Sequence, residues 1–478
     1  MREDGLVSSL DRLSALDAAF LDLETPHAPL HVGWTLRFGG RAPSVAALRR
    51  HVDGRLDRIP RFRRRLAAPG GQLAWIDDPA FHVARHVHHV SLPAPGGPGA
   101  LREAAGVLLG APLDHDRPLW RLHLVDGVAD DEFAIVGQAH HALVDGIAAV
   151  EVALLLFDDG SPAAPSRWRP QAAPSGSRAA AAAARDRVAG GARALAGAGR
   201  LAARPQDGAA LLRAGAQAVS DALVPAPPTA LDRSRTHRRA VAFGGAPLQD
   251  VRDAGRRRGA TVNDVLLAAT ALALGRALAR RGEHPRALKA LVPVNVRAGD
   301  AAALGNAISF TAVELPLDTR DPTAVLRAVR DRTRVAKRGG AAEPLGALAR
   351  AADLLPARAR GALARNAARA TSFNAVVSNV PGPPVALALL GRPLRAVHPA
   401  VPLLDGHGLT IGALSYAGRL HLGVYADAEV LPDAVDVARD LESAFDALRL
   451  APERAGTAET PWRARAAARR EAAGRRAD

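Results

Sequence analysis

The segment from Glu132 to Phe157 restricts the possible folds of this chain more than any other segment. It begins with an apolar run, Glu132–Gln138, whose composition predicts a strand. The paired histidines His140 and His141 follow, and Ile147–Phe157 then has the length and apolar density of a buried helix. The segment therefore predicts a strand, a histidine-containing turn and a helix, an order typical of α/β folds.

Strand-like and helical segments continue to alternate on both sides of this turn. Before it, Leu30–Phe38 predicts a strand and Val45–Ile59 predicts an amphipathic helix. After residue 236 the pattern predicts three helices and two strands, namely Asp250–Gly259, Val262–Arg281 and Ala434–Leu448 as helices, and Ala290–Val294 and Leu420–Tyr425 as strands.

Composition divides the 478 residues into four parts. Residues 1–160 and 236–450 are predicted to form two α/β halves, because the chain is too long for one ordinary core. Residues 161–235 are rich in Ala, Pro and Arg, which indicates an interdomain connector. Residues 451–478 form a basic tail that is predicted to be disordered.

The inventory of residue types narrows the chemistry. There is no cysteine, which excludes disulfides, thiolate zinc sites and cysteine nucleophiles. The formal net charge of +15 suits an anionic partner, either nucleic acid, a phospholipid surface or a phosphate-bearing substrate such as coenzyme A. The N-terminus has no signal-peptide pattern, and Arg276 interrupts the apolar run from Val265, so we expect a cytosolic start and no transmembrane helix.

Proton transfer is therefore expected at the histidine turn. The sequence contains no G-x-S-x-G, no P-loop and no dinucleotide-binding glycine motif. Histidine is the side chain whose unperturbed pKa lies nearest neutrality, so His140 or His141 can accept and return a proton. Asp145 can orient the turn by an ion pair, and Gly146 permits close approach of a substrate. The alternative is that the two histidines only end a strand and that Asp145 caps the next helix.

A second group of histidines raises the question of a metal site. Strand alternation places His82, His86 and His88 on one face and His89 on the other. No carboxylate or thiolate accompanies them, so a solvated strand face is favoured and no metal is expected.

The segment HHALVDG, His140–Gly146, resembles the HHxxxDG signature of coenzyme A-dependent acyltransferases with the chloramphenicol acetyltransferase-like fold, which include condensation domains. The flanking segments are similar to the bacterial wax ester synthase/diacylglycerol acyltransferase (WS/DGAT) family. These segments follow in order as Leu13–Gly33, Pro60–Leu66, Pro112–Trp120, Thr261–Ala268, Val292–Arg297, Leu304–Asn306 and Ser378–Pro383.

The resemblance implies two α/β domains with mixed sheets and an active-site tunnel at their interface. His141 would take the proton from an acceptor hydroxyl, whose oxygen would attack the acyl-CoA thioester while a nearby donor stabilises the oxyanion. His140 and Asp145 would support His141, and Arg297 would be the partner of Asp145.

Further residues are assigned by the resemblance to binding a substrate or shaping the site, namely Gly146, Asn263, Asp264, Arg297, Pro118, Leu119, Trp120, Ser378 and Asn379. Structural alternatives stand beside them. Asn263 with Asp264 can cap the helix that follows, Pro118–Trp120 can be core and turn, and Ser378–Pro383 can be a plain turn. Four arginines, Arg61 and Arg63–Arg65, can contact coenzyme A phosphates or a membrane, or form a solvated helix face.

The implied function is transfer of a long-chain acyl group from acyl-CoA to diacylglycerol, a long-chain alcohol, or both, without a cofactor and without nucleic acid. We expect the protein in the cytoplasm, in peripheral contact with the inner face of the membrane or with lipid bodies. Asn295 and Asp232 depart from the residues common in the family, which leaves the acceptor open. The alternatives are a condensation-like transferase that uses a carrier-protein thioester and a non-catalytic lipid-body coat protein.

Overall fold

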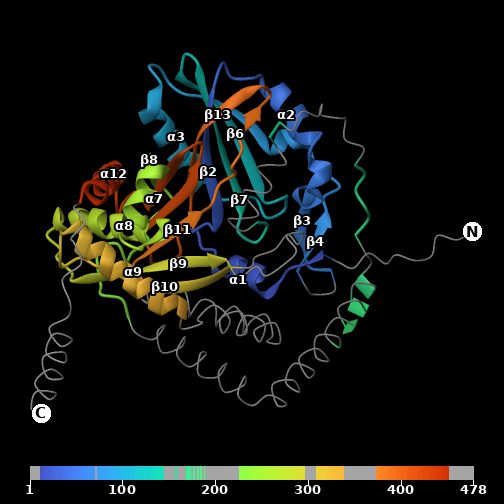
Figure 1. The fold of residues 1–478 in the computed structure, drawn as a ribbon. Coiled ribbons are helices and arrows are strands. Elements are labelled where there is room, and N and C mark those ends of the chain that lie inside the picture. Colours follow the sequence, from blue (N-terminus) through green and yellow to red (C-terminus); the bar gives the residue numbers. More distant parts are fainter. Residues whose placement is uncertain are drawn as a thin grey trace, which may run out of the picture.

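A computed structural model describes residues 11–69, 73–144, 157–158, 168–173, 225–295, 308–338 and 373–451, with a few positions between 176 and 188. Within these residues, two mixed six-stranded sheets carry helices on their faces (Figure 1). The predicted arrangement of two α/β halves with mixed sheets is therefore confirmed.

The first sheet has the strand order β12-β13-β2-β7-β6-β5. Only β5 and β6 pair in parallel, and the other described pairs in it are antiparallel. Two helices, α2 (Val45–Asp53) and α3 (Gly97–Gly110), accompany this sheet. Its strands are β2 (His31–Gly39), β5 (Val87–Ser91), β6 (Trp120–Ala129), β7 (Glu132–His140), β12 (Ala388–Leu389) and β13 (Arg392–Ala400).

The second sheet has the strand order β10-β9-β11-β14-β15-β8, in which β11 is parallel to both of its neighbours. Its strands are β8 (Arg239–Pro247), β9 (Ala287–Asn295), β10 (Ile308–Pro316), β11 (Ala375–Val380), β14 (Leu409–Tyr416) and β15 (Arg419–Asp427). The helices packed on it are α7 (Leu248–Arg256), α8 (Val262–Ala279), α9 (Pro322–Arg338) and α12 (Ala434–Leu450), and Leu, Val and Ala side chains fill the core between them.

Helix α8 is apolar on all sides, because it is the central helix of this core. By length and composition it is apolar enough to cross a membrane, yet 72% of that apolar window is buried inside the protein. It packs against α12, α9 and α7. A helix that is hydrophobic all round is a core helix when neighbours cover it, and α8 has that position here.

Two strands from late in the chain complete the first sheet. β13 pairs antiparallel with β2, so that Val397 lies opposite Leu36 and Pro399 opposite Trp34. Figure 1 shows β13 beside β2, with β9 and β10 of the second sheet below them. The chain between residues 236 and 450 therefore contributes to both sheets, and this exchange ties the two halves together.

Helix α3 joins the halves from the other side. A Cβ on Gly106 would lie 2.3 Å from the carbonyl oxygen of Arg239, and one on Gly110 would lie 2.4 Å from that of His237. Because the two glycines are four residues apart, they lie on one face of the helix. Their missing side chains allow α3 to pack directly on the backbone that leads into β8.

A small three-stranded sheet, β1 (Asp11–Arg12), β4 (Ala74–Asp77) and β3 (Arg64–Ala67), lies beside the first sheet together with α1 (Ala15–Leu23). The predicted helix Val45–Ile59 is wrong at its end, because α2 stops at Asp53 and the short 3₁₀ helix η1 (Leu56–Arg58) follows Gly54. The predicted helix at residues 147–157, most of the connector, and the tail after residue 451 lie outside the described residues.

Candidate active site

The histidine turn is fastened to β2 by backbone hydrogen bonds. His140 ends β7 and lies directly opposite His31 in the pairing with β2. The next amide, that of His141, donates to the carbonyl oxygen of Leu30 at 2.8 Å, and the amide of Leu143 donates to the carbonyl oxygen of His140 at 2.8 Å. The backbone of the turn is therefore held in one conformation, which a positioned general base requires.

His141 lies at the boundary between this turn and a cavity. Its side chain is only 8% exposed, and its ring stacks on Phe20 of α1 with 3.9 Å between the ring centroids and 15° between the planes. It is one of the residues that line the cavity. The imidazole is therefore shielded from bulk water and still accessible to a substrate.

The cavity has a volume of about 270 Å³ and lies between the two sheets. Strand β2 supplies one wall through Val32, Trp34 and Leu36. The neighbouring strand β13 extends this wall through Leu394 and Val397, because it pairs with β2. The opposite wall comes from the second sheet and includes Leu291, Phe310, Val376 and Leu414. This chamber lies at the interface of the halves, where the resemblance implies a tunnel.

Few polar side chains reach this cavity. Besides His141 and the indole of Trp34, the described lining includes Ser378 and Asn379 of β11. Ser378 shares its strand face with Val376 and Val380, which also line the cavity, because side chains alternate along a strand. The structure therefore brings the predicted residues Ser378 and Asn379 to the same cavity as His141.

His140 points away from the cavity. Val32, Trp34 and Leu36 of β2 face the cavity, so His31 and its cross-strand partner His140 lie on the other face of the sheet. His140 is fully buried, and its Nδ1 accepts a hydrogen bond of 3.0 Å from the amide of Ala142. His140 thus supports the turn and does not contact the chamber.

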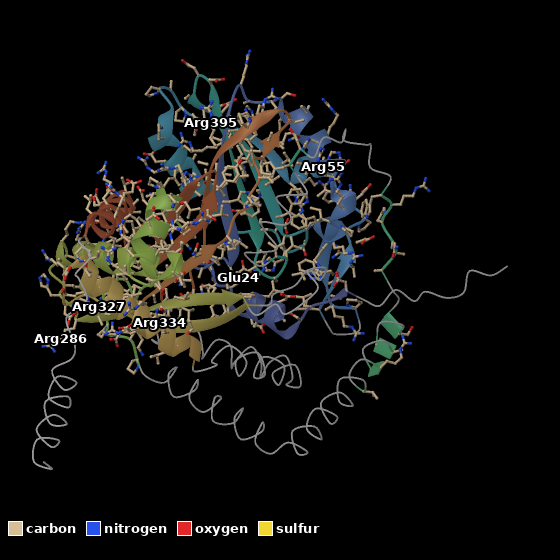
Figure 2. All side chains as sticks on the ribbon, in the orientation of Figure 1. Glu24, Arg55, Arg286, Arg327, Arg334 and Arg395 are labelled. Atoms are coloured by element: carbon tan, nitrogen blue, oxygen red, sulfur yellow. The ribbon has the colours of Figure 1, made fainter. Side chains whose placement is uncertain are left out.

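A carboxylate that the sequence interpretation did not single out lies beside His140. Glu24, the residue that ends α1, places its Oε2 3.5 Å from Nε2 of His140 and 2.8 Å from Nε2 of His115. In Figure 2, Glu24 lies near the ends of β2 and β7, next to α1. Both Glu24 and His115 belong to segments that carry the family resemblance, and this is the sequence signal that could have indicated a function for them in the site.

The electrostatics of this group follow from burial and charge. Burial would raise the pKa of the Glu24 carboxyl, but its contacts with His115 and His140 lower it far below the ordinary range. Its hydrogen bond with Glu24 raises the pKa of His115. Burial lowers the pKa of His140 despite the nearby carboxylate, and it lowers the pKa of His31 to about 3. At neutral pH His140 and His31 are therefore uncharged, and Glu24 is ionised.

The predicted residues Pro118, Leu119 and Trp120 are buried around the histidine turn. The carbonyl oxygen of Leu119 accepts from the amide of His140 at 2.9 Å. The indole N–H of Trp120 donates to the carbonyl oxygen of Phe62 at 2.7 Å. None of the three is in the lining of the main cavity, so they act as the supporting core of the turn.

Asn263 and Asp264 lie at the start of α8. Asp264 forms a capping box with Thr261, and its other carboxylate oxygen accepts from the hydroxyl of Thr333 at 2.6 Å. Neither residue is in the lining of the cavity. Asp264 thus caps helix α8, which is the structural alternative to a function in the site.

Three predicted residues, Asp145, Gly146 and Arg297, lie outside the described residues. Asn295, one of the two departures from the family pattern, ends β9. At the other departure, Asp232 accepts from the amide of Thr229 at 2.7 Å and from the side-chain amide of Asn374 at 3.0 Å. Asp232 therefore stabilises a turn next to the second sheet.

Arg61, Arg63 and Arg64 form ion pairs and do not make up a solvated helix face. Arg61 and Arg64 both pair with Asp11, and Arg64 also pairs with Asp77. Arg63 is 1% exposed and pairs with Asp57. Asp11 belongs to β1, Arg64 to β3 and Asp77 to β4, so these ion pairs hold the strands of the small sheet together.

The idea that His82, His86 and His88 share a strand face is wrong. His82 caps the short 3₁₀ helix η4 (Val83–Arg85), and β5 begins only at Val87. His86 is buried and stacks on Trp120, and His89 pairs with Asp126 at 2.7 Å. The interruption by η4 breaks the alternation on which the prediction depended.

Comparison with solved structures identifies the fold. A wax ester synthase/diacylglycerol acyltransferase from Marinobacter aquaeolei VT8 superposes with a TM-score of 0.68 at 25% identity, covering 92% of this chain and 99% of that protein. The starter condensation domain of rhizomide synthetase, solved with C8-CoA and Leu-SNAC, superposes with a TM-score of 0.57 at 16% identity, over 93% and 94% of the two chains. The predicted fold of the superfamily is thus confirmed.

Sequence comparison identifies the family. The chain is 32% identical to a probable diacylglycerol O-acyltransferase of Mycobacterium tuberculosis and to a putative one of Mycobacterium bovis, over 91% of this chain and 95% of each relative. Residues 13–266 match the model of the wax ester synthase/diacylglycerol acyltransferase catalytic domain, and residues 304–449 match that of the WS/DGAT C-terminal domain. The chain belongs to the wax ester synthase/diacylglycerol acyltransferase family.

Proposed function

We propose that the protein transfers a long-chain acyl group from acyl-CoA to the hydroxyl of diacylglycerol, of a long-chain alcohol, or of both, with His141 as the general base. The observation that carries this proposal is a shielded imidazole in the wall of an apolar cavity between the two halves. Membership of the family supports the reaction class. No cofactor is needed, because the thioester is already an activated donor.

The chemistry proceeds by direct transfer. The His141 imidazole removes the proton from the acceptor hydroxyl, and the oxygen attacks the thioester carbonyl to form a tetrahedral intermediate. When the intermediate collapses, the carbon–sulfur bond breaks, and the imidazolium returns the proton to the departing thiolate of coenzyme A. The products are an ester and free coenzyme A, and no acyl-enzyme forms.

Ser378 is our candidate for stabilising the oxyanion. Its side chain shares the face of β11 with the cavity-lining residues Val376 and Val380, and it faces the cavity from the half opposite His141. In an apolar chamber a hydroxyl donor aimed at developing charge acts more strongly than it would in water. Asn379 also borders the cavity, but strand alternation places its side chain on the other face of β11, with Val377.

The cavity favours a long apolar acyl group. Cavity-lining residues on β2 run from Val32 to Leu36, with Leu30 just before the strand. This row is about 20 Å long at roughly 3.3 Å per residue. The volume of about 270 Å³ lies just below the usual range of roughly 300–1,000 Å³ for small-molecule sites. A long chain laid along β2 would therefore fill it.

We propose a cytoplasmic location with peripheral contact to the inner face of the membrane or to lipid bodies. The net charge of +15 favours an anionic surface. Arg327 and Arg334 of α9 and Arg286 lie together on one side of the second half (Figure 2). Acceptors such as diacylglycerol reside in lipid, so contact with its surface would bring them to the cavity.

The substrate assignment is tested by supplying purified protein with labelled palmitoyl-CoA and a panel of diacylglycerol, hexadecanol and short alcohols. We expect ester formation with diacylglycerol, hexadecanol or both, and slower reaction with short alcohols, because these bury less apolar surface. Turnover with an acyl carrier-protein thioester but none with palmitoyl-CoA would contradict the proposal. Lack of turnover with every donor and acceptor would favour a non-catalytic coat protein.

A further inference from the structure

Helix α1 contacts both histidines of the turn. Phe20 stacks on His141, and Glu24, four residues later at the end of the helix, lies 3.5 Å from Nε2 of His140. Residues four apart lie above one another on the same face of a helix. One face of α1 therefore meets the cavity-facing histidine with an aromatic ring and the buried histidine with a carboxylate.

The hydrogen bonds of His140 determine which nitrogen carries its proton. The amide of Ala142 donates to Nδ1, so Nδ1 has no proton. A neutral imidazole carries one N–H, which therefore lies on Nε2, 3.5 Å from Oε2 of Glu24. At 3.5 Å the attraction is mainly that of a charge for an N–H dipole, and burial strengthens it because little water screens the two groups.

The geometry does not fit a metal ion held by Glu24, His115 and His140, although their ligand atoms all lie within 4.8 Å of one another. Donors bound tetrahedrally to zinc at about 2.0–2.1 Å lie roughly 3.3 Å apart. Oε2 of Glu24 and Nε2 of His115 are separated by 2.8 Å, which is a hydrogen-bond distance. A protonated Nε2 on His140 also has no lone pair to offer.

We propose that Glu24 is a positioning residue that holds His140 as the Nε2–H tautomer and thereby fixes the turn that carries His141. The Nδ1 acceptor of His140 is then always available to the amide of Ala142, the residue that follows His141. The other tautomer would set an N–H against that amide and distort the turn. The inference depends on the proposed function of His141 as the general base.

Glu24→Gln and Glu24→Ala test this function, together with a matched control. Asp126→Ala removes the carboxylate from another histidine–carboxylate pair of the same half, that of His89 and Asp126 at 2.7 Å on the surface. We expect kcat to fall about 10- to 100-fold in both Glu24 variants, because each removes the negative charge that holds His140 in its tautomer. The KM for palmitoyl-CoA should change little, because Glu24 is not in the lining of the cavity. Asp126→Ala should keep the wild-type kcat.

A spectroscopic measurement separates positioning from general damage to the fold. In protein with ¹⁵N-labelled histidine, His140 should show the Nε2–H tautomer in the wild type and a mixture of tautomers in Glu24→Gln. Because Gln keeps the shape of the Glu side chain, this variant serves even if Glu24→Ala does not fold. An unchanged His140 spectrum with a wild-type kcat in Glu24→Gln would overturn the proposal. So would bound metal that is lost on this substitution. Full activity of His141→Ala would instead refute the proposed function of His141.

Discussion

Ser378 allows a test of the reaction at the scale of one residue. If its hydroxyl stabilises the oxyanion, Ser378→Ala should lower kcat by about 10²- to 10³-fold and leave the KM for acyl-CoA nearly unchanged. The measurement is steady-state turnover with palmitoyl-CoA and the best acceptor. Ser415→Ala is the matched control, because Ser415 lies on the neighbouring strand β14 and is not in the lining of the cavity. Equal kcat values for Ser378→Ala and wild type would contradict this function.

Individual residues also show how far the sequence could predict the site. The paired histidines, Ser378 and Asn379 were predicted, because their motifs are compact. Glu24 was not, because it meets His140 only through the packing of α1 against the end of β7. Glu24 and His140 are far apart in the sequence, so no local pattern reveals this contact. Asp264 shows the opposite case: it belongs to a recognisable motif, yet in the structure it caps a helix and does not line the cavity.

At the scale of one element, the cavity-lining side chains of β2 lead to a prediction of which acyl chain length the protein prefers. A second cavity of about 50 Å³ lies beyond the main one, and both are lined by Trp34, Leu36 and Phe157. The indole of Trp34 packs over Gly137 of β7, where a Cβ would lie 2.4 Å from its Nε1. Trp34→Ala should join the cavities and raise the ratio of kcat/KM for C20 over C16 acyl-CoA by about 10-fold. An unchanged ratio would show that the acyl chain does not lie along β2.

The contact between α3 and β8 predicts an effect on stability. Gly106→Val would place a side chain where the carbonyl oxygen of Arg239 now lies 2.3 Å from the added Cβ position. The backbone can move aside only at a cost in energy, so we expect a loss of about 1–3 kcal/mol in the free energy of unfolding. Urea denaturation measures it. Gly99→Val is the control, because the nearest contact there, 3.8 Å away, is the end of the Arg102 side chain. Equal stability of the two variants would contradict the close packing.

The elements that the sequence predicted depend on local patterns. The strands β2, β7, β9 and β15 and the helices α7, α8 and α12 lie within a few residues of their predicted positions. The placement of β13 in the first sheet was not predicted, because strand pairing across hundreds of residues has no local sequence signal. That pairing matters for the site, because β13 supplies Leu394 and Val397 to the cavity.

At the scale of the whole molecule, buried histidines predict how stability depends on pH. Burial lowers the pKa to about 3 for His31 and His398 and to about 4 for His86, His123 and His421. These histidines protonate in the unfolded chain near their ordinary pKa of 6.5, before they do so in the folded protein. The unfolded state thus binds more protons below pH 6.5, and stability should fall as the pH drops from 6.5 toward 3–4.

His123 gives the variant for this prediction, because neither of its ring nitrogens has a hydrogen-bond partner among the described residues. His123→Leu should reduce the slope of unfolding free energy against pH below 6.5 by up to about 1.4 kcal/mol per pH unit. Urea denaturation between pH 4 and 7 measures the slope. An unchanged slope in His123→Leu would contradict the prediction, because it would mean that folding does not lower the pKa of His123.

The central claim is that His141 is the general base in a cavity that the two halves form together. The most direct test compares the turnover of His141→Ala with that of wild type on palmitoyl-CoA, with His82→Ala, an exposed histidine outside the cavity, as the control. We predict that His141→Ala loses about 10²- to 10⁴-fold in kcat while His82→Ala keeps wild-type turnover. Wild-type turnover by folded His141→Ala would contradict the account.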